Sequence, residues 1–450
     1  MTVRPSSDPP PGAATAVLRF PPTFRFGAAT AAYQVEGGNE GSDWWDFEKL
    51  PGRIADGSRS GRACDHYHRF REDLDLLRAL NLTTYRFSIE WARVEPESGR
   101  IDTAALQHYA EVLDACWSRG VEPCVTLSHF TVPRWFADRG GWVAPSSATV
   151  FGRYVRAVRD ALGPQVSLWV TINEPMVYLY HGYMQGIWPP GERSESRMVL
   201  AGRNLLRAHF LAYSILRERV GHGGDLPQVG IAQHLRIFDP AREWNPLDQV
   251  AASVQGRLFN WSFLDCIHQG RMLPPFGVGE GAGTPGPAQD FIGVNYYARG
   301  RVRVSPGTKG ALFGAQETTK GAAKSDLGWE IYPEGLRWLL REVEARYGLP
   351  IWITENGIAD ATDRLRPRYL VDHLVQVARA TAEGIPVKGY FHWSLLDNFE
   401  WAEGLTPRFG LYAMDYATGA RELRKSGEIY AQIAREHAIA PDLLQRGRAL

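Results

Sequence analysis

Short apolar runs alternate with longer amphipathic stretches along most of the chain. The runs, such as "SLWVTINEP" and "PIWITENG", are short enough for strands, and the stretches between them repeat apolar positions at helical spacing. The pattern predicts eight strands, at 25–37, 83–91, 122–130, 167–175, 227–235, 290–297, 350–357 and 387–396. A helix is expected after each strand, near 67–80, 104–120, 148–162, 200–219, 248–268, 334–346, 369–383 and 427–437.

This alternation predicts the fold class. Strands separated by helices favour parallel pairing, because a parallel partner needs a crossover connection. Eight such units predict an α/β protein with a single (β/α)8 TIM barrel, whose active site lies at the C-terminal ends of the strands. A doubly wound open sheet is the alternative. We expect a flexible Pro-rich arm at 1–20, the barrel domain at 21–440 and a tail at 441–450, with Gly/Pro-rich insertions near 273–288 and 305–323 over one face.

Composition and charge narrow the range of partners. Lys+Arg and Asp+Glu both total 50, so the formal net charge is zero and neither nucleic acid nor an anionic membrane is an expected partner. No apolar run approaches the ~18 residues that span a bilayer, and the N-terminus lacks the apolar core of a signal peptide. The four cysteines form no C-x-x-C pair. We expect a cytoplasmic protein, and the sequence carries no signal for an oligomeric state.

Polar and aromatic side chains recur where the predicted strands end. Because the C-terminal ends of barrel strands meet at one mouth, these side chains are expected to converge there. Turn chemistry explains one or two such residues, not this many. They are Gln34, Glu36, Arg86, Glu90, His129, Asn173, Glu174, Gln233, His234, Asn295, Tyr296, Tyr297, Glu355, His392 and Trp393, with Asp397, Glu400, Trp401 and Glu403 in the loop after the eighth strand.

Two of these residues, Glu174 and Glu355, suggest acid/base chemistry on a polyol ring. Glycoside cleavage needs two carboxyl groups, and the 15 tryptophans of the chain offer platforms for a sugar. Metal-dependent hydrolysis would need His and Asp at ligand spacing, but His66 and His68 form the only tight pair. No G-x-S-x-G motif points to a serine hydrolase, and no nucleotide fingerprint is present. We therefore expect no metal and no cofactor.

A series of motifs carries a family resemblance over roughly residues 22–436. In chain order they are "FRFGAATAAYQVEG", "ACDHYHRFREDLDLL", "YRFSIEWARVEPE", "DRGGW", "WVTINEP", "IGVNYY", "GWEIYPEGL", "ITENG" and "HWSLLDNFEWAEG". With these motifs in this order, the chain resembles the family 1 glycoside hydrolases, the β-glucosidase family. The resemblance implies a (β/α)8 barrel that hydrolyses terminal non-reducing β-D-glucosyl residues with retention, through a covalent glycosyl-enzyme. It also implies some activity on β-galactosyl or β-fucosyl residues, so the expected partner is a small β-glycoside or oligosaccharide.

The resemblance also implies roles for individual residues. Glu174 matches the acid/base and is expected to be protonated, whereas Glu355 matches the nucleophile and is expected to be ionised. The residues that match the nucleophile's supports are Arg86, Asn295 and Tyr297. Those that match the sugar-binding set are Gln34, His129, Asn173, Trp393, Glu400 and Trp401, and Trp329 matches the platform for the leaving group.

Two positions depart from the family pattern, and two alternative functions remain. Phe130 stands where the family usually has Trp, and Leu405 replaces the usual aromatic residue after "WAEG". Both changes bear on the choice of sugar. One alternative function is a phospho-β-glycosidase, which Glu400 and Glu403 disfavour because they would repel a phosphate. The other is a non-catalytic sugar-binding barrel, which the presence of both Glu174 and Glu355 disfavours.

Overall fold

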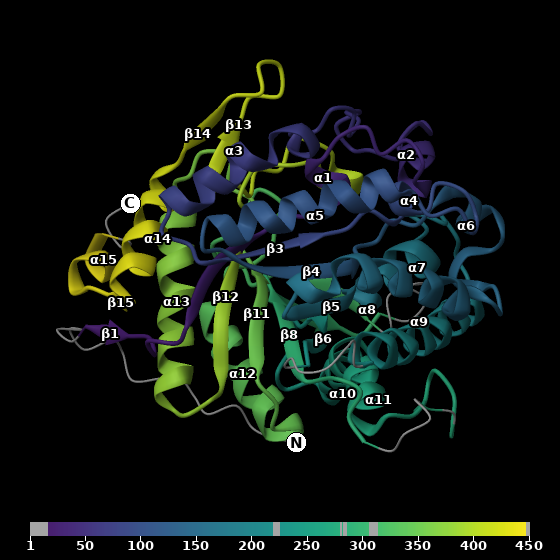
Figure 1. Ribbon diagram of the computed structural model, residues 1–450. Coiled ribbons are helices and arrows are strands. Elements are labelled where there is room, and N and C mark those ends of the chain that lie inside the picture. Colours follow the sequence, from purple (N-terminus) through teal and green to yellow (C-terminus); the bar gives the residue numbers. More distant parts are fainter. Residues whose placement is uncertain (1–16, 219–225, 280, 282–285, 306–313, 447–450) are drawn as a thin grey trace.

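The computed structural model describes residues 17–218, 226–279, 281, 286–305 and 314–446. Its centre is a closed barrel of parallel strands in the order β11-β12-β2-β3-β4-β5-β6-β8, which confirms the predicted TIM barrel and excludes the open sheet (Figure 1). The strands are β2 Arg25–Ala29, β3 Thr84–Ser88, β4 Glu122–Ser128, β5 Leu168–Asn173, β6 Gln228–His234, β8 Phe291–Tyr296, β11 Ile351–Asn356 and β12 Val387–Trp393.

Helices surround the barrel, and most lie within a few residues of the predicted positions. They are α3 His66–Ala79, α5 Thr103–Ser118, α7 Ser147–Leu162, α9 Glu195–Arg217, α10 Pro246–Gly256, α11 Ser262–Gln269, α12 Pro333–Tyr347, α13 Arg366–Ala382 and α14 Lys425–Glu436. Neighbours along the chain pack side by side, as α7 does on α9 and α12 on α13. The helix predicted at 248–268 is interrupted by a π-helical turn, η4 Arg257–Trp261.

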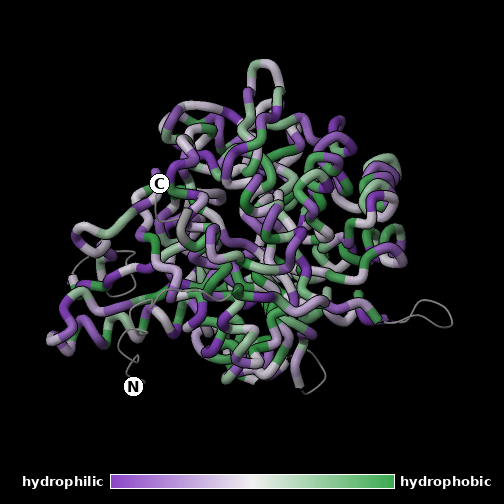
Figure 2. The backbone as a smooth tube through the Cα atoms, turned by 90° about the vertical axis from the view of Figure 1, so that its left-hand side faces the viewer, coloured by the Kyte–Doolittle hydropathy of each residue, from purple (hydrophilic) through white to green (hydrophobic). Residues whose placement is uncertain are grey.

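The barrel strands are buried over nearly their whole length because helices cover them on the outside and side chains fill the inside. Figure 2 shows hydrophobic segments concentrated in the body of the molecule, with hydrophilic stretches common in the peripheral loops. One glycine permits a close approach at the mouth of the barrel. A Cβ on Gly357 would lie 1.8 Å from the carbonyl oxygen of Trp393, so only glycine fits between the ends of β11 and β12.

A small second sheet extends two barrel strands beyond the mouth. β7 Ile237–Pro240 follows β6, β9 Arg299–Arg303 follows β8, and β10 Ala315–Glu317 completes the order β10-β9-β7. Part of the segment predicted as an insertion at 305–323 is therefore a strand, while 306–313, and 280 and 282–285 of the other insertion, lie outside the described residues. Helix α10 packs on β7 and β9 through Ala251, Ala252 and Val302.

The described ends of the chain meet outside the barrel, next to helix α13. β1 Leu18–Arg19 pairs antiparallel with β15 Ala438–Ile439, and a short helix, α15 Pro441–Arg446, follows. Residues 1–16 of the predicted arm and 447–450 of the predicted tail lie outside the described residues, so those boundaries stay predictions. Within the described ranges, no helix is both long and apolar enough to cross a bilayer.

Candidate active site

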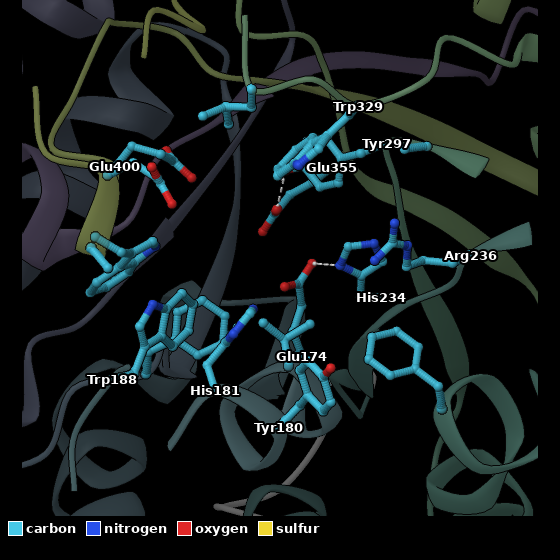
Figure 3. A pocket seen from close by; sticks show the side chains of 18 of the residues that line it. Glu174, Tyr180, His181, Trp188, His234, Arg236, Tyr297, Trp329, Glu355 and Glu400 are labelled. Atoms are coloured by element: carbon cyan, nitrogen blue, oxygen red, sulfur yellow. Dashed lines mark hydrogen bonds and ion pairs between the residues drawn. The ribbon is translucent and has the colours of Figure 1, made fainter. Parts of the chain in front are cut away.

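A deep cavity opens at the C-terminal ends of the strands (Figure 3). Eight of the twelve site residues predicted from the sequence line its wall, namely His129, Glu174, Tyr297, Trp329, Glu355, Trp393, Glu400 and Trp401. The other four, Gln34, Arg86, Asn173 and Asn295, are buried directly beneath that wall and bond to the residues that line it. The structure therefore brings the whole predicted set together.

Glu355, in β11, is fixed from two sides. The Arg86 guanidinium of β3 donates to its Oε1 at 2.6 Å, and the Tyr297 hydroxyl donates to its Oε2 at 2.5 Å. The same guanidinium also donates to Asn173 Oδ1 at 2.6 Å and to the Thr354 carbonyl at 3.1 Å. A cation and a hydroxyl that both bond to one carboxylate stabilise its ionised form and lock its orientation.

Glu174 follows β5 and has different partners. Asn295 Nδ2 donates to its Oε1 at 2.8 Å, and His234 Nδ1 lies 3.4 Å from the same oxygen. His234 Nε2 is buried and has no hydrogen-bond partner in the described part of the chain. Among the described residues, the imidazole of His234 is therefore the only basic side chain within ion-pair distance of Glu174.

The two carboxyl groups compete for one proton. Burial is the largest influence on the pKa of Glu355 and, with the negative charge of Glu174, raises it to about 7 against the opposing effects of Arg86 and Tyr297. Burial also acts to raise the pKa of Glu174, but a protonated His234 and the bonds from His234 and Asn295 lower it below its ordinary value. These directions favour the shared proton on Glu355, which is the reverse of the expected arrangement with Glu174 protonated beside ionised Glu355.

Gln34 and Glu400 form a polar corner of the cavity. Gln34 lies in a short helix, α1 Ala32–Val35, and not at a strand end as predicted, because β2 already ends at Ala29. Its Nε2 donates to Asn398 Oδ1 at 2.8 Å and to Glu400 Oε2 at 3.3 Å. Burial, together with the charges of Glu355 and Glu174, raises the pKa of Glu400 to about 8. At neutral pH Glu400 is therefore largely a neutral carboxylic acid that can both donate and accept hydrogen bonds.

Several aromatic rings line the cavity together with Glu400. The His129 ring stacks on Trp393, with centroids 5.9 Å apart, and on Trp401, at 6.1 Å. Phe130 meets Trp401 edge-on at 5.2 Å and Trp188 at 4.8 Å. The position that departs from the family pattern is thus already packed between two tryptophans. Leu405 does not line the cavity, and its backbone N–H donates to Asp56 Oδ2 at 2.8 Å.

Three residues of the site have backbone angles that are unusual for side-chain-bearing residues. The φ values are +45° at Glu174, +72° at Phe130 and +52° at Trp401, all in the left-handed region. Such conformations cost of order 1–3 kcal/mol each and persist where the surrounding structure enforces them, commonly at functional sites. Their occurrence together at one cavity is independent support for a functional role of this cavity.

Several strand-end residues noted in the sequence have structural roles instead. Glu36 pairs with Arg93 at 2.8 Å, and Glu90 accepts a bond from the Thr131 hydroxyl at 2.9 Å. Asp397 pairs with Arg424 at 2.7 Å and holds the loop after β12. His66 bonds to Asp73 at 2.8 Å, and His68 bonds to Asp65, so the histidine pair at the start of α3 is occupied by carboxylates. No cluster of potential metal ligands occurs among the described residues.

The sequence did not predict the other half of the cavity wall. Its residues are Tyr180, His181, Trp188, Arg236, Phe238, Gln255, Phe259 and Gln316, and His234, which was noted only as a strand-end residue, joins them. They come from the π-helix η3 Tyr180–Gln185 and the segment after it, from β6–β7, from α10–η4 and from β10. One signal was available, because "RGRVR" at 299–303 alternates polar and apolar residues as a strand does.

A barrel of this kind, with two buried carboxyl groups among aromatic rings and amides at its mouth, defines the class of carbohydrate-cleaving barrel enzymes. The model of "Glycosyl hydrolase family 1" matches residues 17–275 and 286–439. The chain therefore belongs to glycosyl hydrolase family 1 and is a glycosidase, as the resemblance implied.

Individual relatives agree with this assignment. Beta-glucosidase A of Thermotoga maritima is 35% identical, covering 94% of this chain and 99% of that protein. The solved structure of a beta-glycosidase from Pyrococcus horikoshii is 40% identical, with a TM-score of 0.88 over 96% of this chain and 98% of that one. A Thermotoga maritima beta-glucosidase solved in complex with galacto-hydroximolactam is 34% identical, with a TM-score of 0.87 over 94% of this chain and 100% of that one.

Proposed function

We propose that the protein is a cytoplasmic retaining β-glucosidase in which Glu355 is the nucleophile and Glu174 the acid/base. The observation that carries the proposal is the different set of partners of the two carboxyl groups. Glu355 is held by a permanent cation and a hydroxyl, whereas Glu174 has an amide and an imidazole. The first set suits a carboxylate that attacks, and the second suits a group that exchanges a proton.

The proposed reaction has two steps. Glu355 attacks the anomeric carbon while Glu174 gives its proton to the glycosidic oxygen, so the aglycone leaves as a neutral alcohol and a glycosyl ester forms. The ester carries no charge, so repulsion of a second negative charge on Glu174 disappears. Glu174 then takes a proton from water as the water oxygen attacks the anomeric carbon, which releases the sugar and regenerates the Glu355 carboxylate.

The remaining residues hold the sugar in this proposal. Trp393 lies under the ring, Gln34, His129, Glu400 and Trp401 bind its hydroxyls, and Asn173 meets the 2-hydroxyl, where a bond strengthens in the transition state. Asn173 is well placed for that role because Arg86 donates to its Oδ1 at 2.6 Å and Asn295 donates to the same oxygen at 3.1 Å. Trp329 is the platform for the leaving group, and its ring lies 5.6 Å from that of Tyr297.

Beta-galactosides and beta-fucosides are proposed as secondary substrates. Glu400 is largely protonated at neutral pH, since its pKa is raised by burial to about 8, and a carboxylic acid can donate to or accept from either orientation of a sugar hydroxyl. The Thermotoga maritima relative has been solved with galacto-hydroximolactam, which supports this breadth. A neutral Glu400 would repel a phosphate group less than a charged one, which weakens the argument against a phospho-β-glycosidase. The test therefore includes a 6-phosphorylated substrate.

The test combines turnover with stereochemistry. The wild type should hydrolyse 4-nitrophenyl β-D-glucopyranoside faster than its 6-phosphate, and NMR should detect the β-anomer of glucose first. Glu355→Gln should lose activity by on the order of 10⁴-fold or more, as when a catalytic nucleophile is removed. Glu174→Gln should regain turnover of a 2,4-dinitrophenyl glucoside when azide is added, because azide attacks without general-base help. The α-anomer appearing first would refute retention, and no turnover by a folded wild type would favour a sugar-binding barrel.

A further inference from the structure

One cation on the cavity wall, Arg236, has no anionic partner among the residues that the structure describes. Arg236 lies between β6 and β7, and its side chain is partly exposed to the cavity. Its backbone N–H and C=O bond to Asn260, but within the described ranges its guanidinium forms no ion pair and no hydrogen bond, and Nε is buried. Burial lowers the pKa of Arg236, which reflects the cost of keeping a cation away from water without an anion beside it.

Other buried arginines in this protein are paired. Arg86 bonds to Glu355 at 2.6 Å, Arg421 to Asp73 at 2.8 Å, and Arg366 to Asp363. A contact with Phe238 is the only aromatic contact of the Arg236 guanidinium among the described residues, and at 6.0 Å to the ring centroid it lies at the limit of a cation–π interaction. A contact of this kind provides no hydrogen-bond acceptor for the N–H groups of the guanidinium. Packing alone does not account for an arginine at this place.

Arg236 lies on the side of the cavity that receives the leaving group. Glu174 gives its proton to the glycosidic oxygen in the proposed reaction, so the aglycone extends past Glu174 away from the sugar. His234, two residues before Arg236, has Nδ1 3.4 Å from Glu174 Oε1, and Figure 3 shows His234 and Arg236 on one flank of Glu174, across the cavity from Glu400. The cation therefore borders the space for the aglycone and not the space for the sugar.

The surroundings of Arg236 are flat and aromatic. The Phe238 and Phe259 rings meet edge-on at 5.8 Å, and His234 meets Phe259 at 5.6 Å. The amides nearby are occupied, because Gln316 Nε2 donates to Gln255 Oε1 at 3.3 Å and Gln255 Nε2 donates to the Gly314 carbonyl at 2.9 Å. An aromatic slot with one planar cation suits a flat ring that ends in a carboxylate, because guanidinium and carboxylate match in two parallel hydrogen bonds.

We propose that Arg236 is a specificity residue that binds the carboxylate of an acidic aromatic aglycone, so that the natural substrates include β-glucosides of phenolic acids. The inference deepens the proposed function and rests on it. It differs from the phosphate alternative in position, because a 6-phosphate would sit on the sugar beside Glu400, whereas this anion sits on the aglycone.

The kinetic test uses a matched pair of substrates, 4-carboxyphenyl and 4-carbamoylphenyl β-D-glucopyranoside. The ratio of their kcat/KM values is compared in the wild type, in Arg236→Gln and in Arg236→Lys. A charge-assisted bond in a partly exposed site is worth about ten-fold in that ratio. We expect Arg236→Gln to lower the preference for the carboxylate by about that factor, Arg236→Lys to keep part of it, and added salt to reduce it in the wild type.

The control is Arg303→Gln, which removes one positive charge from the same small sheet at an exposed side chain that pairs with Glu317 at 2.8 Å. It should leave the ratio unchanged. Binding of the two corresponding 1-thioglucosides, measured by calorimetry, tests recognition without turnover. An equal ratio in the wild type and Arg236→Gln, or an equal fall in Arg303→Gln, overturns the inference. A wild type that hydrolyses neither glucoside, yet binds the carboxylate thioglucoside more tightly through Arg236, overturns the proposed function and with it the claim about substrates, and keeps only the assignment of Arg236 as a carboxylate-binding residue.

Discussion

The two halves of the cavity are built on different principles. The half that we propose holds the sugar, around Glu355, Asn173 and Trp393, is carried by barrel strands, and its polar groups bond to one another. The half that we propose holds the aglycone, around Arg236, Phe238 and Gln316, is carried by the small sheet and by η4, and its cation has no ion-pair partner among the described residues. This difference indicates that barrel strands can hold the reacting carboxyl groups rigidly, while segments added at the mouth contact the leaving group.

The largest expected effect is on Arg86. Arg86→Met removes a cation that bonds to Glu355, Asn173 and Thr354 at once, and it leaves those acceptors buried. Breaking a buried ion pair from one side costs about 3–5 kcal/mol of unfolding free energy, and activity should fall by on the order of 10³-fold or more. Urea unfolding and kcat/KM measure both effects. Arg421→Met, which breaks the remote pair with Asp73, should lose stability and keep its activity per folded molecule.

Tyr297→Phe tests the hydrogen bond to Glu355 in the proposed sugar half. The hydroxyl bonds to Glu355 Oε2 at 2.5 Å, and a hydrogen bond to a charged group is worth about 1.5–3 kcal/mol, so kcat/KM should fall by about 10–100-fold. The bond also lowers the pKa of Glu355, so its loss should move the acidic limb of the pH profile to higher pH. Tyr296→Phe, which loses a bond to the Tyr332 carbonyl outside the cavity, is the matched control. An unmoved acidic limb would contradict the assigned contact.

His234→Phe tests how a residue between the two halves changes the pKa of Glu174. His234 lowers the pKa of Glu174, so removing the imidazole should let Glu174 hold its proton to higher pH. The alkaline limb of kcat/KM for 4-nitrophenyl β-glucoside should therefore move upward, while Arg86 still bonds to Glu355 and Arg236, His181, Tyr297 and Glu400 still face the cavity. His108→Phe, remote from the cavity, should leave the profile in place. A downward shift in His234→Phe would reverse the assigned role.

The smallest expected effect is the stability change in Arg236→Met. In the described part of the chain Arg236 has no carboxylate partner that the change would leave unpaired, so the change relieves a desolvation cost. It should leave the unfolding free energy unchanged or raise it by up to about 1 kcal/mol. The contrast with Arg86→Met, measured by the same urea titration, is the direct comparison of the two halves. A loss of several kcal/mol in Arg236→Met would mean that its guanidinium stabilises the folded protein.

The strand pattern predicted that most residues of the proposed sugar half lie together, whereas their roles came from the family resemblance. The run at 350–357 contains β11 and Glu355, and the run at 167–175 contains β5 and Asn173, so burial and position were visible together. Gln34 was placed at a strand end because its four-residue helix spans about one helical turn, so no apolar position repeats at helical spacing within it. Arg236 could not be distinguished from other arginines, since the lack of a partner depends on how β7 and η4 pack.

The closure of the barrel has a consequence for how the protein is made. β2 pairs with β12, yet Val387 follows Ala29 by 358 residues. A ribosome that adds about 5–20 residues each second needs roughly 20–70 s to cover that interval. During synthesis β2 therefore emerges long before its final neighbour exists, with one edge of backbone N–H and C=O groups open to other chains. The last barrel strand to appear, β12, is the one that closes this edge, so the nascent chain depends on protection of its first barrel strand until most of its length has been translated.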